Sequence, residues 1–221
     1  MSIRILLADD HGIIRQGLRS LLEEQPDIEV VGEAEDGRVA MQLVQELAPD
    51  IVIMDITMPN LNGVDATHEI VVSKFPKVKV IALSIHSDRH FVANMLKAGA
   101  SGYVLKECLF DEFVQAVRTV AAGGTYLSSR ITGVVIDDYV KRLSTTPESQ
   151  LATLAILTDR EREVLQLLAE GKTTKQIALE LHVSAKTIEA NRRQIMEKLG
   201  VHSVAELTKY AVREGLTSLE P

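Results

Sequence analysis

The sequence predicts a two-domain protein in which an α/β domain with a parallel sheet precedes a small all-helical domain. The length of 221 residues exceeds that of one average domain, about 100–150 residues. In the first part of the chain, short apolar runs alternate with helix-length segments, which is typical of a parallel sheet covered by helices on both faces. After about residue 154, short helical segments follow capping residues and no strand pattern appears.

Five apolar runs have the length of strands, and the first three carry almost no polar residues. Strands that are buried on both faces have this composition. A helix-length segment follows each run, and Gly123-Gly124 ends the last of these segments. The expected strands are Ile3–Ala8, Ile28–Gly32, Ile51–Met54, Val78–Leu83 and Gly102–Leu105, and the expected helices are Ile14–Glu23, Val39–Leu47, Ala66–Ser73, Arg89–Ala98 and Phe110–Ala122.

The domain boundary is expected after a further helical pattern at about Ser128–Leu143, in the turn-rich stretch "STTPESQ". The expected division is an α/β domain over 1–125, a helical linker over 126–153 and a helical domain over 154–221. Within the last domain we expect four helices. Three residue pairs there have capping-box spacing, and Ser184 is a further cap; the pairs are Thr158 with Glu161, Thr173 with Gln176 and Ser203 with Glu206.

Composition excludes several classes of protein. The apolar content of 46% with only 4% aromatic residues and no Trp fits a soluble α/β protein with an aliphatic core. No apolar run approaches the roughly 20 residues of a membrane-spanning helix, and Met1–Asp10 lacks a signal-peptide core, so we expect a cytoplasmic protein without membrane contact. Cys108 is the single cysteine, which excludes an internal disulfide and a cysteine metal cluster.

Charge is unevenly distributed along the chain. Residues 1–125 hold 11 Lys and Arg against 18 Asp and Glu, whereas residues 158–221 hold 10 of each. Because a negative field repels nucleic acid, any DNA contact is expected from the C-terminal domain, where basic residues are locally concentrated.

Polar side chains follow four of the expected strands. Asp9 and Asp10 follow the first strand, Asp55 the third, Ser84 the fourth and Lys106 the fifth. The carboxyl ends of parallel strands meet at one edge of a sheet, where function gathers. Crowded carboxylates repel one another, and a hard cation such as Mg²⁺, which prefers oxygen ligands, would compensate. The lysine adds a charge able to hold a phosphoryl oxygen.

These motifs resemble the receiver domain of response regulators over residues 1–125. The matching elements are "ADDH", "MDITMP" with its following glycine, "LS" and "GYVLK". The resemblance implies a flavodoxin-like five-stranded parallel sheet, with Asp55 as the nucleophile that takes a phosphoryl group from a phosphohistidine of a sensor histidine kinase. It also implies Mg²⁺ bound by Asp10, Asp55 and the Thr57 backbone carbonyl, with Asp9 alongside through water.

The same resemblance implies further catalytic and switching roles. Lys106 and the Ser84 hydroxyl would stabilise charge on the transferred group. Ser84 and Tyr103 would form a switch that changes the surface of the fourth helix, fifth strand and fifth helix. Pro59 and Gly63 would shape the loop after Asp55 without taking part in the chemistry.

The C-terminal stretch resembles the LuxR-type helix-turn-helix of NarL/FixJ regulators from Leu157 nearly to the end of the chain. The matching motifs are "LTDREREVL", "TTKQIA" after a glycine, and "KTIE". Helical spacing independently places Ile188, Ile195 and Leu199 on one face of a helix over Ser184–Leu199 and leaves a polar face opposite. The candidate DNA-binding residues are Thr173, Thr174, Lys175, Lys186, Thr187, Glu189, Ala190, Arg192, Arg193 and Lys198.

A recognition helix presents such a polar face to the major groove of double-stranded DNA. Arg193 could pair with guanine, and Glu189 could accept a hydrogen bond from cytosine. The threonines and the other basic side chains would contact phosphates. The final helix, about Val204–Arg213, would close the domain and offer part of its apolar stripe to a two-fold contact. The resemblance implies a homodimer that reads inverted half-sites.

The leading hypothesis is a transcription regulator gated by phosphorylation of Asp55, with no enzymatic activity beyond its own phosphotransfer and dephosphorylation. A hydrolase of the haloacid-dehalogenase type would need a second acid where this chain has Thr57. A flavodoxin-like mononucleotide binder is disfavoured because "DDHG" would repel a bound phosphate. A regulator that works through protein contacts or constitutive DNA binding, without phosphorylation, is a third alternative.

Overall fold

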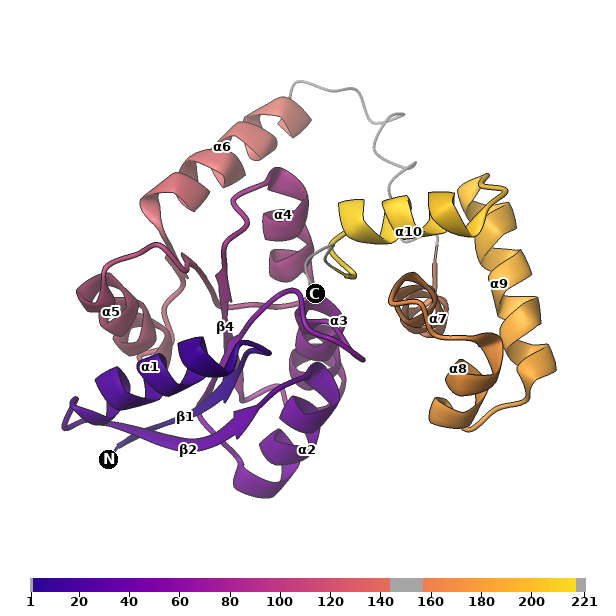
Figure 1. Ribbon diagram of the computed structural model, residues 1–221. Helices are drawn as coiled ribbons and strands as arrows, with labels where there is room; N and C mark the ends of the chain where they lie inside the picture. Colours follow the sequence, from indigo (N-terminus) through magenta and orange to yellow (C-terminus); the bar gives the residue numbers. More distant parts are fainter. Residues whose placement is uncertain (1, 144–156, 218–221) are drawn as a thin grey trace. The chain divides into compact units, whose positions relative to one another are not determined.

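The structure is a computed structural model that describes residues 2–143 and 157–217. The chain divides into two compact units, Met1–Val140 and Lys141–Pro221, which Figure 1 shows in indigo to salmon and in orange to yellow. Each unit has its own hydrophobic core. In the part of the chain that the structure describes, no helix is both long enough and apolar enough to cross a membrane.

The first unit is built on a parallel sheet of six strands in the order β2-β1-β3-β4-β5-β6. The five expected strands are present, so the α/β fold is confirmed. The expectation of five strands was one short, because a strand of two residues pairs with β5 at the sheet edge. The strands are β1 (Ile3–Ala8), β2 (Ile28–Ala34), β3 (Ile51–Met54), β4 (Lys79–Ser84), β5 (Gly102–Leu105) and β6 (Tyr126–Leu127).

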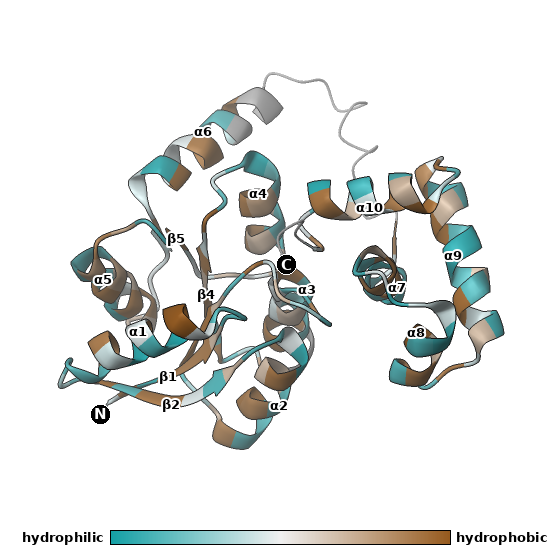
Figure 2. Cartoon of the chain, in the orientation of Figure 1, coloured by the Kyte–Doolittle hydropathy of each residue, from teal (hydrophilic) through white to brown (hydrophobic). Residues whose placement is uncertain are grey.

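Alternate residues of each central strand face two separate cores. Leu6 and Val52 lie in one core, whereas Ile5 and Ile53 lie in the other. Hydrophobic residues therefore run continuously through the central strands, while the surrounding helices mix hydrophobic and hydrophilic residues (Figure 2). Burial of both sheet faces is the physical reason for the unbroken apolar runs in the sequence.

The helices of the first unit cover both sheet faces. Residues of α1 and α5 contribute to one core, and residues of α2, α3, α4 and α6 contribute to the other. The helices are α1 (Gly12–Glu23), α2 (Gly37–Leu47), α3 (Gly63–His68), α4 (Arg89–Lys97), α5 (Phe110–Ala121) and α6 (Ser129–Leu143), and a π-helical segment, η1 (Glu69–Lys74), continues α3.

The third helix differs from the one expected at Ala66–Ser73. It begins earlier because the Asn62 side chain accepts a hydrogen bond from the Asp65 amide at 2.9 Å and so caps the first turn. Its second half widens into η1, at whose end the Phe75 amide donates to the Ile70 carbonyl at 2.6 Å. The first turn of α3, which lies next to Asp55, was therefore not predicted from the apolar pattern.

The segment expected to be a linker after residue 125 begins inside the first unit. Strand β6 pairs with β5, and Ile131 of α6 is fully buried in the core formed with α2 and α4. Burial of this side chain fixes the start of α6 to the receiver-like sheet, so the compact unit extends to Val140.

Residues 157–217, the described part of the second unit after α6, contain four helices, as expected. Thr158 and Thr173 form complete capping boxes, and Ser184 caps its helix through the Thr187 amide. Ser203 caps its helix, but Glu206 accepts from the His202 amide and leaves this third box incomplete. The helices are α7 (Asp159–Ala169), α8 (Thr174–Glu180), α9 (Ala185–Leu199) and α10 (Val204–Arg213).

Candidate functional site: an acidic pocket and a helical DNA-reading face

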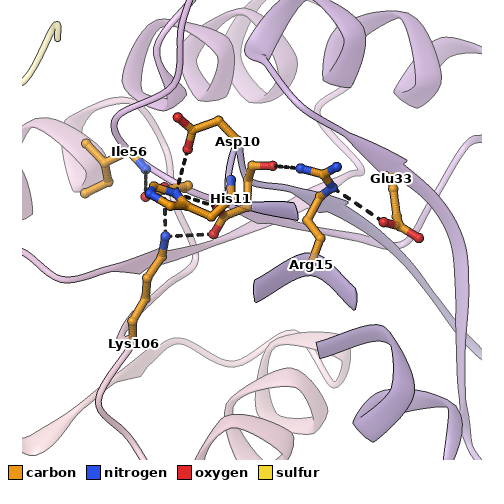
Figure 3. Close-up of polar contacts among 8 residues, drawn as sticks. Asp10, His11, Arg15, Glu33, Ile56 and Lys106 are labelled. Atoms are coloured by element: carbon orange, nitrogen blue, oxygen red, sulfur yellow. Dashed lines mark hydrogen bonds and ion pairs between the residues drawn. The ribbon is translucent and has the colours of Figure 1, made fainter. Parts of the chain in front are cut away.

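The carboxyl ends of β1, β3 and β5 bring Asp9, Asp55 and Lys106 into direct contact, as the sequence predicts. Both aspartates are only 3% exposed. The Lys106 ammonium lies 2.7 Å from Asp9 Oδ2 and 2.8 Å from Asp55 Oδ2 (Figure 3). One cation therefore bridges two buried carboxylates that come from distant parts of the chain.

The backbone around Asp55 is fixed closely. Its Oδ1 accepts a hydrogen bond from the Ile56 amide at 2.7 Å, and the Gly63 amide donates to the Ile56 carbonyl at 2.8 Å. A Cβ atom at position 63 would lie 1.8 Å from the Asp55 carbonyl oxygen. Glycine is thus required there by close approach of the α3 start to the Asp55 backbone, consistent with the loop-shaping role predicted for it.

Burial dominates the ionisation of Asp55. It raises the pKa of this carboxyl from 3.8 to about 6, although Lys106 acts in the opposite direction; the nearby charge of Asp9 adds to the increase. For Lys106, burial lowers the pKa, but the two carboxylates outweigh it and the net direction is upward. At neutral pH the pair is therefore a protonated lysine beside a carboxylate that remains available as a nucleophile.

Asp10 and His11 complete the acidic pocket on its exposed side (Figure 3). One ligand atom from each of Asp9, Asp10, His11 and Asp55 lies within 4.8 Å of all the others. Three of these donors are carboxylates, which suit a hard divalent cation such as Mg²⁺. The chemistry of this set of residues fits the metal predicted from the sequence and adds one nitrogen donor.

Sequence reasoning missed two residues that contact this pocket. His11 directly follows the aspartate pair, and its Nδ1 lies 3.1 Å from Asp9 Oδ1 and 2.9 Å from Asp10 Oδ1. Arg15, one turn into α1, donates to the Asp9 carbonyl and lies 3.4 Å from Glu33 of β2 (Figure 3). Position in the "DDHG" motif singles out the histidine, whereas the arginine is revealed only by the side-chain path.

The remaining predicted pocket residues lie in the neighbouring loops. Ser84 is fully buried at the end of β4, and its hydroxyl accepts a hydrogen bond from the His86 amide at 3.1 Å. The ring of Tyr103 is fully buried, and its hydroxyl donates to the His86 carbonyl at 2.7 Å. Thr57 is partly buried in the loop after β3. The loop after β4 is thus tied to both expected switch residues.

The candidate DNA-reading residues lie mainly on the exposed side of α9. Ile188 and Ile195 are fully buried in the helical core, which leaves the opposite side of α9 to solvent. Among the predicted contacts, Lys175, Lys186, Thr187, Glu189, Ala190 and Arg193 are exposed, Thr174 and Arg192 are partly buried, and Thr173 is exposed as the cap of α8.

Three of these residues also have partners within the unit. The Lys198 ammonium lies 2.6 Å from Glu161 Oε2, which also accepts from the Thr158 amide in the capping box of α7. The hydroxyls of Ser184 and Thr187 are 2.8 Å apart, and Thr173 Oγ1 donates to Gln176 Oε1 at 2.7 Å. Lys198 therefore stabilises the contact between α7 and α9, whereas its predicted phosphate contact stays a prediction.

Comparison with known families covers both units. Residues 5–118 match the response regulator receiver domain, and residues 155–211 match the bacterial regulatory proteins of the luxR family. The chain belongs to the NarL/FixJ response regulators. It is therefore a two-component response regulator with a receiver domain and a LuxR-type DNA-binding domain, and a regulator of transcription.

Relatives of this response regulator match along nearly its whole length. It is 38% identical to the transcriptional regulatory protein DegU of Brevibacillus brevis, over 96% of this chain and 94% of DegU. It is 39% identical to the oxygen regulatory protein NreC of Staphylococcus carnosus, over 97% and 99% of the two chains. RcsB of Salmonella enterica serovar Typhimurium, solved on a promoter with the phosphomimetic BeF₃⁻, matches with a TM-score of 0.60 and 25% identity, over 98% of this chain and all of that one.

Proposed function

We propose that Asp55 of this response regulator accepts a phosphoryl group from a phosphohistidine of a sensor kinase, and that this modification controls dimerisation and DNA binding. The single observation that carries the proposal is the Asp55 carboxylate itself. It is 3% exposed, lies at the end of a buried strand, and contacts the Lys106 ammonium at 2.8 Å. A purely structural residue at this position would not need a buried charge whose pKa is raised.

The transfer would proceed as a displacement at phosphorus. A carboxylate oxygen of Asp55 attacks the phosphorus atom, the P–N bond to the kinase histidine breaks, and the imidazole leaves with the bonding electron pair and takes up a proton. Lys106, whose ammonium contacts Asp9 and Asp55, would hold an oxygen of the transferred group. Water later attacks the acyl phosphate, which returns Asp55 and releases phosphate.

Asp9, Asp10 and Asp55 would hold Mg²⁺, which when bound neutralises charge on the phosphoryl oxygens. The three carboxylates fit this role because each places an oxygen atom in one cluster. The Thr57 carbonyl is the fourth ligand that we propose, in the loop directly after Asp55. Lys106 alone cannot balance three carboxylates at neutral pH, so the apo pocket retains an excess of negative charge.

The C-terminal unit would bind double-stranded DNA through α9 and the start of α8. Arg193 and Glu189, which are exposed, would contact the DNA bases, and the exposed Lys175 and Lys186 would contact phosphates. Two copies would read inverted half-sites, as expected for a two-fold dimer. Action on chromosomal DNA implies that the protein works in the cytoplasm.

Intact mass spectrometry with Mg²⁺ and acetyl phosphate tests the phosphorylation step. Wild type should gain one phosphoryl group, Asp55→Asn should gain none, and Glu29→Gln, which changes an exposed carboxylate of strand β2, should behave as wild type. Omission of Mg²⁺ should abolish the adduct. An adduct that persists in Asp55→Asn would refute Asp55 as the acceptor.

DNA binding at fixed salt, measured on the same three proteins with BeF₃⁻ and Mg²⁺, tests the regulatory step. We expect tighter DNA binding and a shift to dimer in size-exclusion chromatography for wild type and Glu29→Gln, and no change for Asp55→Asn. A normal Asp55 adduct with unchanged DNA affinity and unchanged size would instead support a regulator whose output does not depend on phosphorylation.

A further inference from the structure

The His11 imidazole is directed into the acidic pocket and is not used by the helix that it precedes. His11 is the N-cap residue of α1, yet its side chain makes no capping hydrogen bond. Its Nδ1 lies 2.9 Å from Asp10 Oδ1 and 3.1 Å from Asp9 Oδ1 (Figure 3). The side chain is 57% exposed, so packing against the protein does not force it into this position.

A single N–H proton on Nδ1 would have to be shared between these two contacts. A ring nitrogen carries at most one proton, and Asp9 Oδ1 already accepts a hydrogen bond from the His11 amide at 2.8 Å. A cation placed among the three atoms would satisfy both carboxylates and the nitrogen lone pair together. Neighbouring ligands of an octahedral ion with bonds of about 2.1 Å are about 3 Å apart, and the two distances from Nδ1 to the carboxylate oxygens are 3.1 and 2.9 Å.

We propose that His11 Nδ1 is a ligand of the divalent-cation site, so that the pocket of this protein favours imidazole-accepting transition ions such as Co²⁺ or Ni²⁺ relative to Mg²⁺. Imidazole suits such ions, whereas Mg²⁺ prefers oxygen ligands. The inference rests on the proposed metal site of Asp9, Asp10 and Asp55, and it adds a nitrogen ligand and a selectivity to that site.

Co²⁺ binding to the full-length protein without a polyhistidine tag tests the inference with no need for phosphotransfer. An imidazole bound to Co²⁺ through Nδ1 keeps an Nε2 proton, which gives a strongly shifted proton NMR signal that disappears in D₂O. We expect one such signal in wild type, its loss in His11→Asn, and its retention in His202→Asn, which removes an exposed imidazole of the other unit. Excess Mg²⁺ should suppress the signal by competition for the pocket.

Calorimetric titrations supply the second readout. His11→Asn should weaken Co²⁺ binding by on the order of tenfold and leave the Mg²⁺ affinity within about twofold, because Mg²⁺ depends on the oxygen ligands. His11 is exposed, so the variant should keep the wild-type circular dichroism spectrum. Equal losses of affinity for Co²⁺ and Mg²⁺ would assign His11 to positioning the carboxylates and overturn ligation.

The outcomes separate this inference from the proposed function. Co²⁺ that binds wild type but not Asp55→Asn, without an exchangeable shifted signal, would overturn the role of His11 and leave the phosphoacceptor pocket intact. Absence of Co²⁺ binding to wild type would also overturn it. An imidazole signal in a protein that acetyl phosphate does not modify would support His11 as a ligand and refute the phosphorylation proposal.

Discussion

The carboxylate of Asp55 is held in an environment that opposes its charge, and this cost should be measurable as stability. Its pKa in the folded protein, about 6, lies above the ordinary 3.8. The folded state therefore binds more protons in this range, so the contribution of Asp55 becomes less favourable as the pH rises from about 4 to about 6. The buried charge of Asp55 therefore opposes folding at neutral pH.

Asp55→Asn should consequently stabilise the receiver unit in the presence of a chelator. We expect a gain of about 1–3 kcal/mol at pH 7, reduced by the loss of the Lys106 contact, and a gain close to zero at pH 4. The measurement is the urea midpoint of the receiver unit in the intact protein. Hydrogen-exchange mass spectrometry reports it through the peptides that contain β1 and β3. A variant less stable than wild type at pH 7 would show that the Lys106 contact outweighs burial of the charge.

Close approach of backbone to Asp55 makes position 63 intolerant of any side chain. Gly63→Ala should destabilise the receiver unit by several kcal/mol, on the order of an overpacked core site, because its Cβ would meet the Asp55 carbonyl oxygen at 1.8 Å. Gly17→Ala is the control, since a Cβ at position 17 in α1 meets nothing within 4 Å and alanine favours helix by about 1 kcal/mol. Equal effects of the two substitutions on the urea midpoint would contradict this account.

At the scale of elements, α7 and α9 are joined by one carboxylate. Burial acts to raise the pKa of Glu161, but the Lys198 ammonium and the Thr158 cap together hold it below its ordinary 4.5. Because the pKa is lowered in the folded state, this group stabilises the unit above pH 4.5, and the contribution is lost as the pH falls through the folded-state pKa. Protonation of Glu161 in acid should therefore weaken the contact that holds α9 against α7.

Two substitutions separate the cap from the ion pair. Glu161→Gln keeps a capping box, as the natural pair Thr173 and Gln176 shows, and should cost up to about 1 kcal/mol from the partly exposed Lys198 contact. Glu161→Ala also removes the reciprocal half of the capping box, the hydrogen bond from the Thr158 amide to the residue-161 side chain, and should cost about 1 kcal/mol more. Urea unfolding of the C-terminal unit at pH 7 and below pH 4 measures both effects. If Glu161→Gln is less stable than wild type below pH 4 by the same amount as at pH 7, the ion pair is not the cause of the lost stability.

Helices and strands could be predicted from the sequence wherever a residue pattern repeats. Features that depend on a single contact could not be predicted. Buried strands such as Ile51–Met54 and capped helices such as α8 follow from periodicity and capping residues. Strand β6 has only two residues, too few for an alternating pattern, and it is defined by pairing with β5. The roles of Arg15 and His11 in the pocket depend on side-chain direction, which residue type alone does not specify.

At the scale of the whole molecule, the acidic charge of residues 1–125 opposes the DNA-binding function of the other unit. Eighteen acidic against eleven basic residues make the receiver repel phosphates, whereas residues 158–221 hold equal numbers of basic and acidic side chains. The protein as a whole carries a formal net charge of −7. Non-specific DNA affinity should therefore be low and strongly dependent on salt, which leaves room for a modification at Asp55 to control binding.

Thermodynamic linkage gives a prediction for the whole molecule that does not depend on how its two units are arranged. If BeF₃⁻ with Mg²⁺ at Asp55 increases DNA affinity by some factor, DNA must increase BeF₃⁻ affinity by the same factor, which for coupled sites is about 5–150. The measurement is a fluorine NMR titration of BeF₃⁻ at fixed protein concentration and salt, with and without an operator selected in vitro. Arg193→Ala should lose the DNA-dependent gain and keep the BeF₃⁻ affinity of the free protein. If BeF₃⁻ leaves the DNA affinity of wild type unchanged and DNA leaves the BeF₃⁻ affinity unchanged, the two sites are not coupled and Asp55 does not control DNA binding.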